Sequence, residues 1–162
     1  GAMEDLAAFG LELRRNHGEV LRVRPSGPWG DRIVNNVTWA LPLGDGTYRV
    51  GSPYRWDIHE PVCLDESPAA LMQGATNART TAQDMECLEH RAGLRPTCFD
   101  RRPILGVVSK YHPYYHACVG WGTRGVTIGP TVARWTVEAL LGDREAVPDE
   151  VHPKRFPTFT EN

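Results

Sequence analysis

One stretch near the C-terminal end of the sequence limits the possible folds more than any other. Within residues 91–143, a β-type run ends at Gly120 and the glycine-rich segment GWGTRG follows it, from Gly120 to Gly125. After this segment, apolar residues recur at the spacing of one helix face: Ile128, Val132, Trp135 and Ala139. The stretch therefore predicts a strand over 114–120, a glycine loop, and a helix that reaches about Leu141.

The letters GWGTRG satisfy the pattern G-x-G-x-x-G, in which glycines let backbone N–H groups and a helix N-terminus approach a pyrophosphate. A dinucleotide-binding βαβ unit also needs a second parallel strand after the helix. Here the helix is followed by a tail with Pro148, Pro153 and Pro157, and proline is poorly suited to a central strand. We therefore expect a loop that contacts a cofactor, but no parallel strand after the helix and no Rossmann domain.

The rest of the chain predicts further strands and a longer helix. Segments 18–24, 33–43, 47–51 and 104–108 are β-like, and Asp45-Gly46 is a strong hairpin signal. Ser67 followed by Pro68 predicts a helix start, and apolar residues at helical spacing continue towards His90, although Gly74 weakens the pattern. These elements predict an α+β fold with a mainly antiparallel sheet and two or three helices.

Composition excludes some classes of function. Lys and Arg number 18 and Asp and Glu number 20, so no excess of positive charge favours a nucleic acid or a membrane surface as partner. No apolar run reaches the roughly 18 to 20 residues needed to span a bilayer, and no signal peptide is visible. We therefore expect a cytoplasmic protein. Residues 1–3, Gly-Ala-Met, resemble an expression scar, and residues 4–162 are expected to form a single domain.

The four cysteines are dispersed along the chain and form no C-x-x-C pair, which is typical of free thiols. They are Cys63, Cys87, Cys98 and Cys118. A metal site could be assembled from Cys87, Cys118 and the histidines at 90, 112 and 116. Because Cys118 lies in an apolar run, where a thiol is commonly a small hydrophobic group, we assign no metal ligand.

Several motifs occur in the order and spacing of one enzyme superfamily. They are Gly93-Leu94-Arg95-Pro96, then Asp100 with Pro103 and Gly106, then residues 120–130 and 153–156, preceded by a strand-like segment at 18–23. On these residues, the chain resembles the C-terminal part of the FAD-dependent D-amino acid oxidase superfamily, which includes glycine oxidase and sarcosine oxidase. The likeness runs from about Asn16 to Phe156. The N-terminal flavin-binding βαβ of the superfamily has no counterpart in the sequence.

The resemblance implies substrate-binding roles for Arg95, Trp39 and Tyr54. Arg95 falls in the motif of the superfamily's substrate-carboxylate arginine, and a forked, permanent cation suits bidentate capture of a carboxylate. Trp39 and Tyr54 flank the predicted hairpin, whose face covers the flavin in the resembling enzymes. Read without the resemblance, Arg95 is a surface residue or the ion-pair partner of Asp100, and the aromatic pair is part of the core.

The resemblance also implies that the glycine loop contacts the flavin end of FAD. The expected contacts are Gly120, Gly122, Thr123, Arg124, Gly125 and Val126. Backbone N–H groups at the start of a helix are unsatisfied and favour negative charge. The alternative reading of this segment is a helix N-terminus capped by Thr123. No catalytic residue is expected, since flavin amine oxidation in this superfamily is thought to need no protein base.

Taken together, the motifs predict the C-terminal portion of an FAD-dependent oxidoreductase. Completed by an N-terminal FAD-binding half or subunit, it would oxidise a small-molecule amine or amino acid by hydride transfer to the flavin. Alone, the chain is expected to be inactive and to bind FAD weakly or not at all. The alternative is a non-catalytic binding or interaction module that kept the sheet and lost the cofactor.

Overall fold

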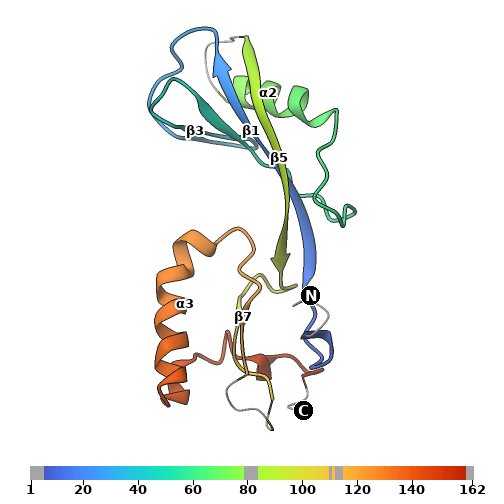
Figure 1. Cartoon of the computed structure of the whole chain (residues 1–162), viewed down its shortest axis with the longest axis vertical. Coiled ribbons are helices and arrows are strands. Elements are labelled where there is room, and N and C mark those ends of the chain that lie inside the picture. The colour runs from blue at the N-terminus through green and yellow to red at the C-terminus, as the bar shows by residue number, and fades with distance from the viewer. Residues whose placement is uncertain (1–5, 79–83, 110, 112–114, 160–162) are drawn as a thin grey trace. The chain divides into compact units, whose positions relative to one another are not determined.

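The computed structural model describes residues 6–78, 84–109, 111 and 115–159, and these form two compact units. We call residues 16–94 the α2 unit, and residues 1–15 together with 95–162 the α3 unit, after the helix that each contains. Figure 1 shows the elements of both units along the chain. Within the described ranges, no helix combines the length and hydrophobicity needed to cross a membrane.

The α2 unit is built on a five-stranded sheet with the order β2-β3-β4-β1-β5. Its strands are β1 (Arg14–Pro25), β2 (Val34–Asn35), β3 (Trp39–Pro42), β4 (Tyr48–Gly51) and β5 (Met85–Thr97). The pairs β1/β4, β2/β3 and β3/β4 are antiparallel. Helix α2 (Ser67–Asn77) packs on one face of this sheet.

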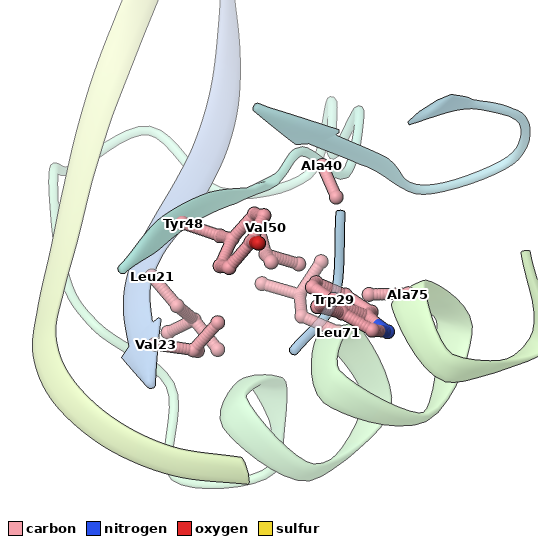
Figure 2. Close-up of a cluster of buried hydrophobic side chains, with 8 residues drawn as sticks. All are labelled: Leu21, Val23, Trp29, Ala40, Tyr48, Val50, Leu71 and Ala75. Carbon is pink, nitrogen blue, oxygen red and sulfur yellow. The ribbon is translucent and has the colours of Figure 1, made fainter. Parts of the chain in front are cut away.

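The core of the α2 unit lies between the sheet and α2. Alternate residues of a strand point to the same face, and Leu21 and Val23 of β1 and Tyr48 and Val50 of β4 are buried here. Trp29, from the loop after β1, packs edge-on against Tyr48 with ring centroids 5.0 Å apart. Figure 2 shows the buried side chains of this cluster: Leu21, Val23, Trp29, Ala40, Tyr48, Val50, Leu71 and Ala75.

The predicted hairpin at Asp45-Gly46 is present between β3 and β4. The backbone N–H of Leu43 donates to the carbonyl of Thr47 at 3.0 Å, and Gly46 has a φ of 78°, a conformation that glycine adopts readily. Hydrogen bonds from the hydroxyl and the backbone N–H of Thr47 lower the pKa of Asp45 to about 2. Asp45 also accepts a hydrogen bond from Arg22 of β1 at 2.6 Å. The turn is therefore tied to the neighbouring strand.

The α3 unit combines a two-stranded antiparallel hairpin with the longest helix. The hairpin consists of β6 (Ile104–Val107) and β7 (His116–Val119), and α3 (Gly125–Leu140) follows it. Val132 and Ala139 of α3 are buried in one cluster with Leu105, Val147 and Val151, and the half-buried side chains around it include Trp121, Ile128 and Trp135. The helix face predicted from the sequence is therefore confirmed.

After α3, the described residues contain the short 3₁₀ turns η1 (Arg144–Ala146) and η2 (Pro153–Arg155), but no strand. The expectation that no parallel strand follows α3 is therefore confirmed for this part of the chain. The α+β class with a mainly antiparallel sheet is also confirmed.

Two predicted elements are shorter in the structure than the sequence predicted. The segment 33–43 is not one strand, because the chain turns at 36–38 and β2 pairs antiparallel with β3. The helix that starts at Ser67 ends at Asn77, and Met85–His90 belongs to β5, while 79–83 lie outside the described residues. Membership of the sheet beside β1 overrides the helical spacing of these residues. The N-cap of α2 is Glu66, one residue before Ser67.

Candidate functional site

The glycine loop turns through residues in the left-handed region. Gly120 has a φ of 76° and Gly122 a φ of 55°, values that other residues rarely adopt. A Cβ atom on Gly120 would lie 2.4 Å from the Sγ of Cys98, so this glycine also gives room to a buried thiol. Burial raises the pKa of that thiol to about 11, which supports packing as the role of Cys98.

Trp121 lies against the first turns of α3. A Cβ atom on Gly125 would be 3.6 Å from Cε3 of Trp121, and one on Gly129 would be 3.3 Å from its Cζ3. The space beside Gly125 is therefore taken by an indole ring of the same unit. This neighbour of Gly125 was not visible in the sequence. The contact of Gly125 with flavin stays a prediction.

The start of α3 leaves backbone donors available. The N-cap is Arg124 rather than Thr123, and no side chain caps the helix. Among the described residues, the N–H groups of Gly125 and Val126 have no acceptor, as expected for the first turn of a helix. Thr123, Arg124 and Val126 are exposed, and the Arg124 guanidinium donates to the carbonyl of Arg101. This end of α3 suits an anionic or electron-rich group.

Arg95 lies beside the glycine loop. It is a half-buried residue near the end of β5. The N–H of Gly122 donates to the carbonyl of Pro96 at 3.0 Å, and an isolated β-bridge joins Thr97 to Trp121. The structure thus brings together, within the α3 unit, the predicted carboxylate-binding arginine and the predicted flavin-contacting loop.

Asp100, the alternative ion-pair partner for Arg95, is held by Arg155. The Nε of Arg155 lies 2.9 Å from a carboxylate oxygen of Asp100. Burial alone would raise the pKa of Asp100, but hydrogen bonds from Arg155 and from the backbone N–H of Arg102 outweigh it and hold the pKa below its ordinary value. The same guanidinium donates to the carbonyl of Val151 at 2.8 Å, so it also anchors the segment on which α3 packs.

Trp39 and Tyr54 belong to the α2 unit. Ala40 and Val50 point to α2 in the core, so their strand neighbours Trp39 and Gly51 point to the opposite face. A Cβ atom on Gly51 would lie 2.8 Å from Cζ2 of Trp39, which places the indole over this glycine. Trp39 is half-buried and Tyr54 is exposed. Neither ring belongs to the core cluster, contrary to the core reading of this pair.

The sequence reading missed a buried polar cluster at the start of β1. Glu19 is fully buried, one carboxylate oxygen accepts from the N–H of Leu64 at 3.2 Å, and the other lies 3.5 Å from Nε2 of His90. His17, also fully buried, bonds through Nε2 to the carbonyl of Val62 at 2.8 Å. These contacts hold the segment before α2 against the sheet. This cluster could have been predicted from the polar residues that precede the apolar residues of β1, Asn16-His17-Gly18-Glu19.

The cysteines do not pair with one another. Within the ranges that the structure describes, no group of three or more His, Cys, Asp or Glu side chains is arranged to hold a metal ion. His112 lies outside those ranges.

Comparison with known proteins identifies the family. The FAD-dependent oxidoreductase (DAO) family matches residues 2–139, which is most of the sequence. The chain belongs to this family. The bifunctional protein MnmC of Aromatoleum aromaticum, named for tRNA 5-methylaminomethyl-2-thiouridine biosynthesis, is 25% identical over 172 residues, covering 92% of this chain but 27% of that protein.

Solved structures of amine and amino acid oxidases share the fold of this DAO-family chain. Glycine oxidase from Bacillus cereus superposes with a TM-score of 0.73 at 19% identity, covering 90% of this chain and 40% of that one. Iminodiacetate oxidase from Chelativorans sp. gives 0.73 at 23% identity, covering 94% and 43%. The chain therefore spans only about a quarter to two fifths of the length of these relatives.

Proposed function

We propose that this chain is the C-terminal portion of an FAD-dependent oxidoreductase that oxidises an amine or amino acid, completed by an N-terminal FAD-binding half. The observation that carries the proposal is the uncapped start of α3, whose loop is hydrogen-bonded through Gly122 to Pro96, next to Arg95. Membership of the DAO family supplies the class of chemistry. The balanced charge supports a small-molecule substrate over a nucleic acid or a membrane, and a cytoplasmic location is part of the same proposal.

The loop residues fit the flavin end of FAD. We infer contacts from Gly120, Gly122, Thr123, Arg124, Gly125 and Val126, of which Gly125 and Val126 offer N–H groups without an acceptor in the described part of the chain. When bound, FAD supplies the redox chemistry by accepting a hydride from the carbon beside the substrate nitrogen. The partly positive end of α3 stabilises electron density that develops beside it.

We infer substrate-binding roles for Arg95, in the α3 unit, and for Trp39 and Tyr54, in the α2 unit. Arg95 binds the carboxylate of an amino acid with its forked donors, and its place near the end of β5 holds it next to the loop. Trp39 and Tyr54 provide aromatic surface from the α2 unit, and neither lies in the core between the sheet and α2. No side chain is assigned as a general base.

Flavin uptake tests the proposal directly. The isolated chain is titrated with FAD by calorimetry, and its absorbance near the flavin bands is recorded alone and with any N-terminal FAD-binding half encoded upstream. We expect weak or no binding alone, and a flavin spectrum that is bleached by an amine or amino acid once the half is added. A submicromolar dissociation constant for the chain alone contradicts the role of a completing half.

Arg95→Leu tests the substrate role in the reconstituted enzyme. Loss of a buried, charge-assisted contact costs on the order of 2 to 4 kcal/mol, which is roughly 30-fold to 1000-fold in kcat/KM for carboxylate-bearing substrates. Flavin content should not change. Arg91→Leu is the matched control, because Arg91 is an exposed arginine on the same strand. Equal kcat/KM values for the two variants would return Arg95 to a structural role.

The second candidate is an interaction module without catalysis, favoured by the small share of each relative that the chain covers. A complex with the upstream half that shows no flavin spectrum would support this candidate instead.

A further inference from the structure

Residues 55–66 of the α2 unit, between β4 and α2, form a loop that is closed at its base. The guanidinium of Arg55 lies 3.4 Å from a carboxylate oxygen of Glu66 and donates to the hydroxyl of Ser67, the first residue of α2, at 3.3 Å. The first and last residues of the loop are therefore neighbours, as in an Ω-loop. Tyr54 directly precedes the loop.

The hydrophobic core does not hold loop 55–66. No side chain of this loop belongs to the core cluster between the sheet and α2. Among the described residues, its backbone pairs with the sheet at Arg55 alone, whose N–H and carbonyl bond to the backbone of His17 at 3.1 and 2.8 Å. The rest of the loop therefore needs another attachment.

Two buried side chains of β1 supply that attachment. One carboxylate oxygen of Glu19 accepts from the N–H of Leu64 at 3.2 Å. Nε2 of His17 donates to the carbonyl of Val62 at 2.8 Å, since a carbonyl oxygen can only accept. Both side chains are fully buried, where polar groups are costly unless they have partners. Polar side chains from the sheet thus hold the second half of the loop.

The carboxylate of Glu19 also reaches β5. Its other oxygen lies 3.5 Å from Nε2 of His90, and the carbonyl of His90 accepts from the thiol of Cys63 in the loop at 3.6 Å. An apolar side chain could fill the space of Glu19, but it would leave the N–H of Leu64 without its acceptor. One buried carboxylate therefore links β1, β5 and loop 55–66.

We propose that Glu19 is a positioning residue for substrate binding, acting through loop 55–66 on Tyr54. The inference rests on the proposed function, which assigns Tyr54 to the substrate. Tyr54 is bonded along the chain to Arg55, where the base of the loop and β1 meet. By holding Leu64, Glu19 keeps Glu66 beside Arg55 and so fixes the backbone that carries Tyr54. Because Glu19 is buried, it acts without touching the substrate.

Amide exchange in the isolated chain, followed by NMR, tests the attachment. Glu19→Leu removes the acceptor of Leu64, whereas Glu19→Gln keeps an oxygen in its place. We expect the Leu64 amide to exchange at least about 10-fold faster in Glu19→Leu, and within about 3-fold of the unsubstituted rate in Glu19→Gln. Glu86→Leu is the matched control, because Glu86 is an exposed carboxylate on β5 that pairs with Arg24. Unchanged exchange of Leu64 in Glu19→Leu overturns the inference.

Kinetics of the enzyme reconstituted with any N-terminal FAD-binding half encoded upstream test the consequence. We expect Glu19→Leu to raise KM roughly 10-fold with kcat within about 3-fold, and Glu19→Gln and Glu86→Leu to keep KM within about 3-fold. In a Tyr54→Ala background, Glu19→Leu should raise KM by less than about 3-fold, because the contact that it positions is already lost. The same increase in both backgrounds would show a merely structural role and overturn the inference.

His17→Leu keeps the inference testable if Glu19→Leu does not fold. It removes the bond to Val62 and leaves Glu19 in place, so KM should rise and the rise should depend on Tyr54. An unchanged KM in a folded His17→Leu enzyme that oxidises amines overturns the inference alone. A complex that oxidises no amine or amino acid overturns the proposed function and with it the role of Tyr54, while exchange of Leu64 still decides whether Glu19 holds the loop.

Discussion

The two helices of this protein differ in how their apolar residues are used. Helix α2 buries one face, with Ser67, Leu71 and Ala75, and exposes small or polar residues such as Ala69 and Gln73. Helix α3 buries one apolar face, and the large exposed apolar residues on it and at its C-cap are Val126, Val137, Leu140 and Leu141. Among the described residues, the large apolar side chains of α2 are buried or half-buried, whereas several of those on α3 are exposed. An apolar side chain stabilises the fold only where its own unit buries it, so the two helices should respond differently to the loss of a leucine.

The largest expected effect comes from shortening one leucine in each helix. Leu71 of α2 is 6% exposed, and Leu71→Ala should lower the free energy of unfolding by about 3 kcal/mol through lost burial and a cavity. Leu141, at the end of α3, is 84% exposed, so Leu141→Ala should change the isolated chain by less than about 0.5 kcal/mol. Urea unfolding of both variants checks this. A large loss for Leu141→Ala would mean that this leucine is buried in the folded chain.

A smaller effect is expected at Gly74 of α2. Glycine weakens a helix, and replacing it with alanine at an unconstrained site should stabilise by up to about 1 kcal/mol. Here a Cβ atom would lie 2.3 Å from Oγ1 of Thr38, which is buried, so Gly74→Ala should instead destabilise by about 1 to 2 kcal/mol.

The Gly74 prediction has an internal control in Thr38→Ala. This change removes the oxygen that Gly74→Ala would meet, so the effect of Gly74→Ala should turn neutral or stabilising in that background. Thermal unfolding of the two single variants and the double variant measures the coupling. Additive effects would show that α2 does not need this close approach to the strands.

The smallest effect concerns the segment that α3 packs against. Arg155 holds Asp100 and donates to the carbonyl of Val151, a member of the α3 core cluster. The folded-state pKa of Asp100 is lowered, so its contribution is present at neutral pH and is lost as the pH falls through that pKa. Asp100→Asn should therefore cost about 1 kcal/mol at pH 7, and the difference should vanish in acid. Urea unfolding at a series of pH values from 7 downward tests this, and a difference that grows in acid would contradict it.

Local sequence signals predicted the buried face of α3 and the β3–β4 hairpin well. The apolar spacing of Ile128, Val132, Trp135 and Ala139 gave the buried face of α3, and Asp45-Gly46 gave the hairpin. They failed at Met85–His90, because residues spaced for a helix joined the sheet beside β1. A short segment without a strong period takes the structure that its long-range neighbours offer.

The candidate site was also predicted only in part from the sequence. Sequence motifs singled out Arg95 and the glycine loop, and membership of the DAO family followed from the sequence. The hydrogen bond from Gly122 to Pro96, the indole of Trp121 beside Gly125, and the pairing of Asp100 with Arg155 were not visible in it. Each depends on which residues far apart in the chain come into contact.

Neighbours along the chain set three properties that the amino-acid sequence is sufficient to predict: the periodicity of α3, the positive-φ turns at glycines, and the unsuitability of the proline-bearing tail for a central strand. Which apolar residues are covered depends instead on contacts between distant parts of the chain. Val132 and Val137 lie on the same helix and have the same side chain, yet one is 1% exposed and the other 54%. Burial depends on the packing of β6 and the segment around Val151, which no local pattern encodes.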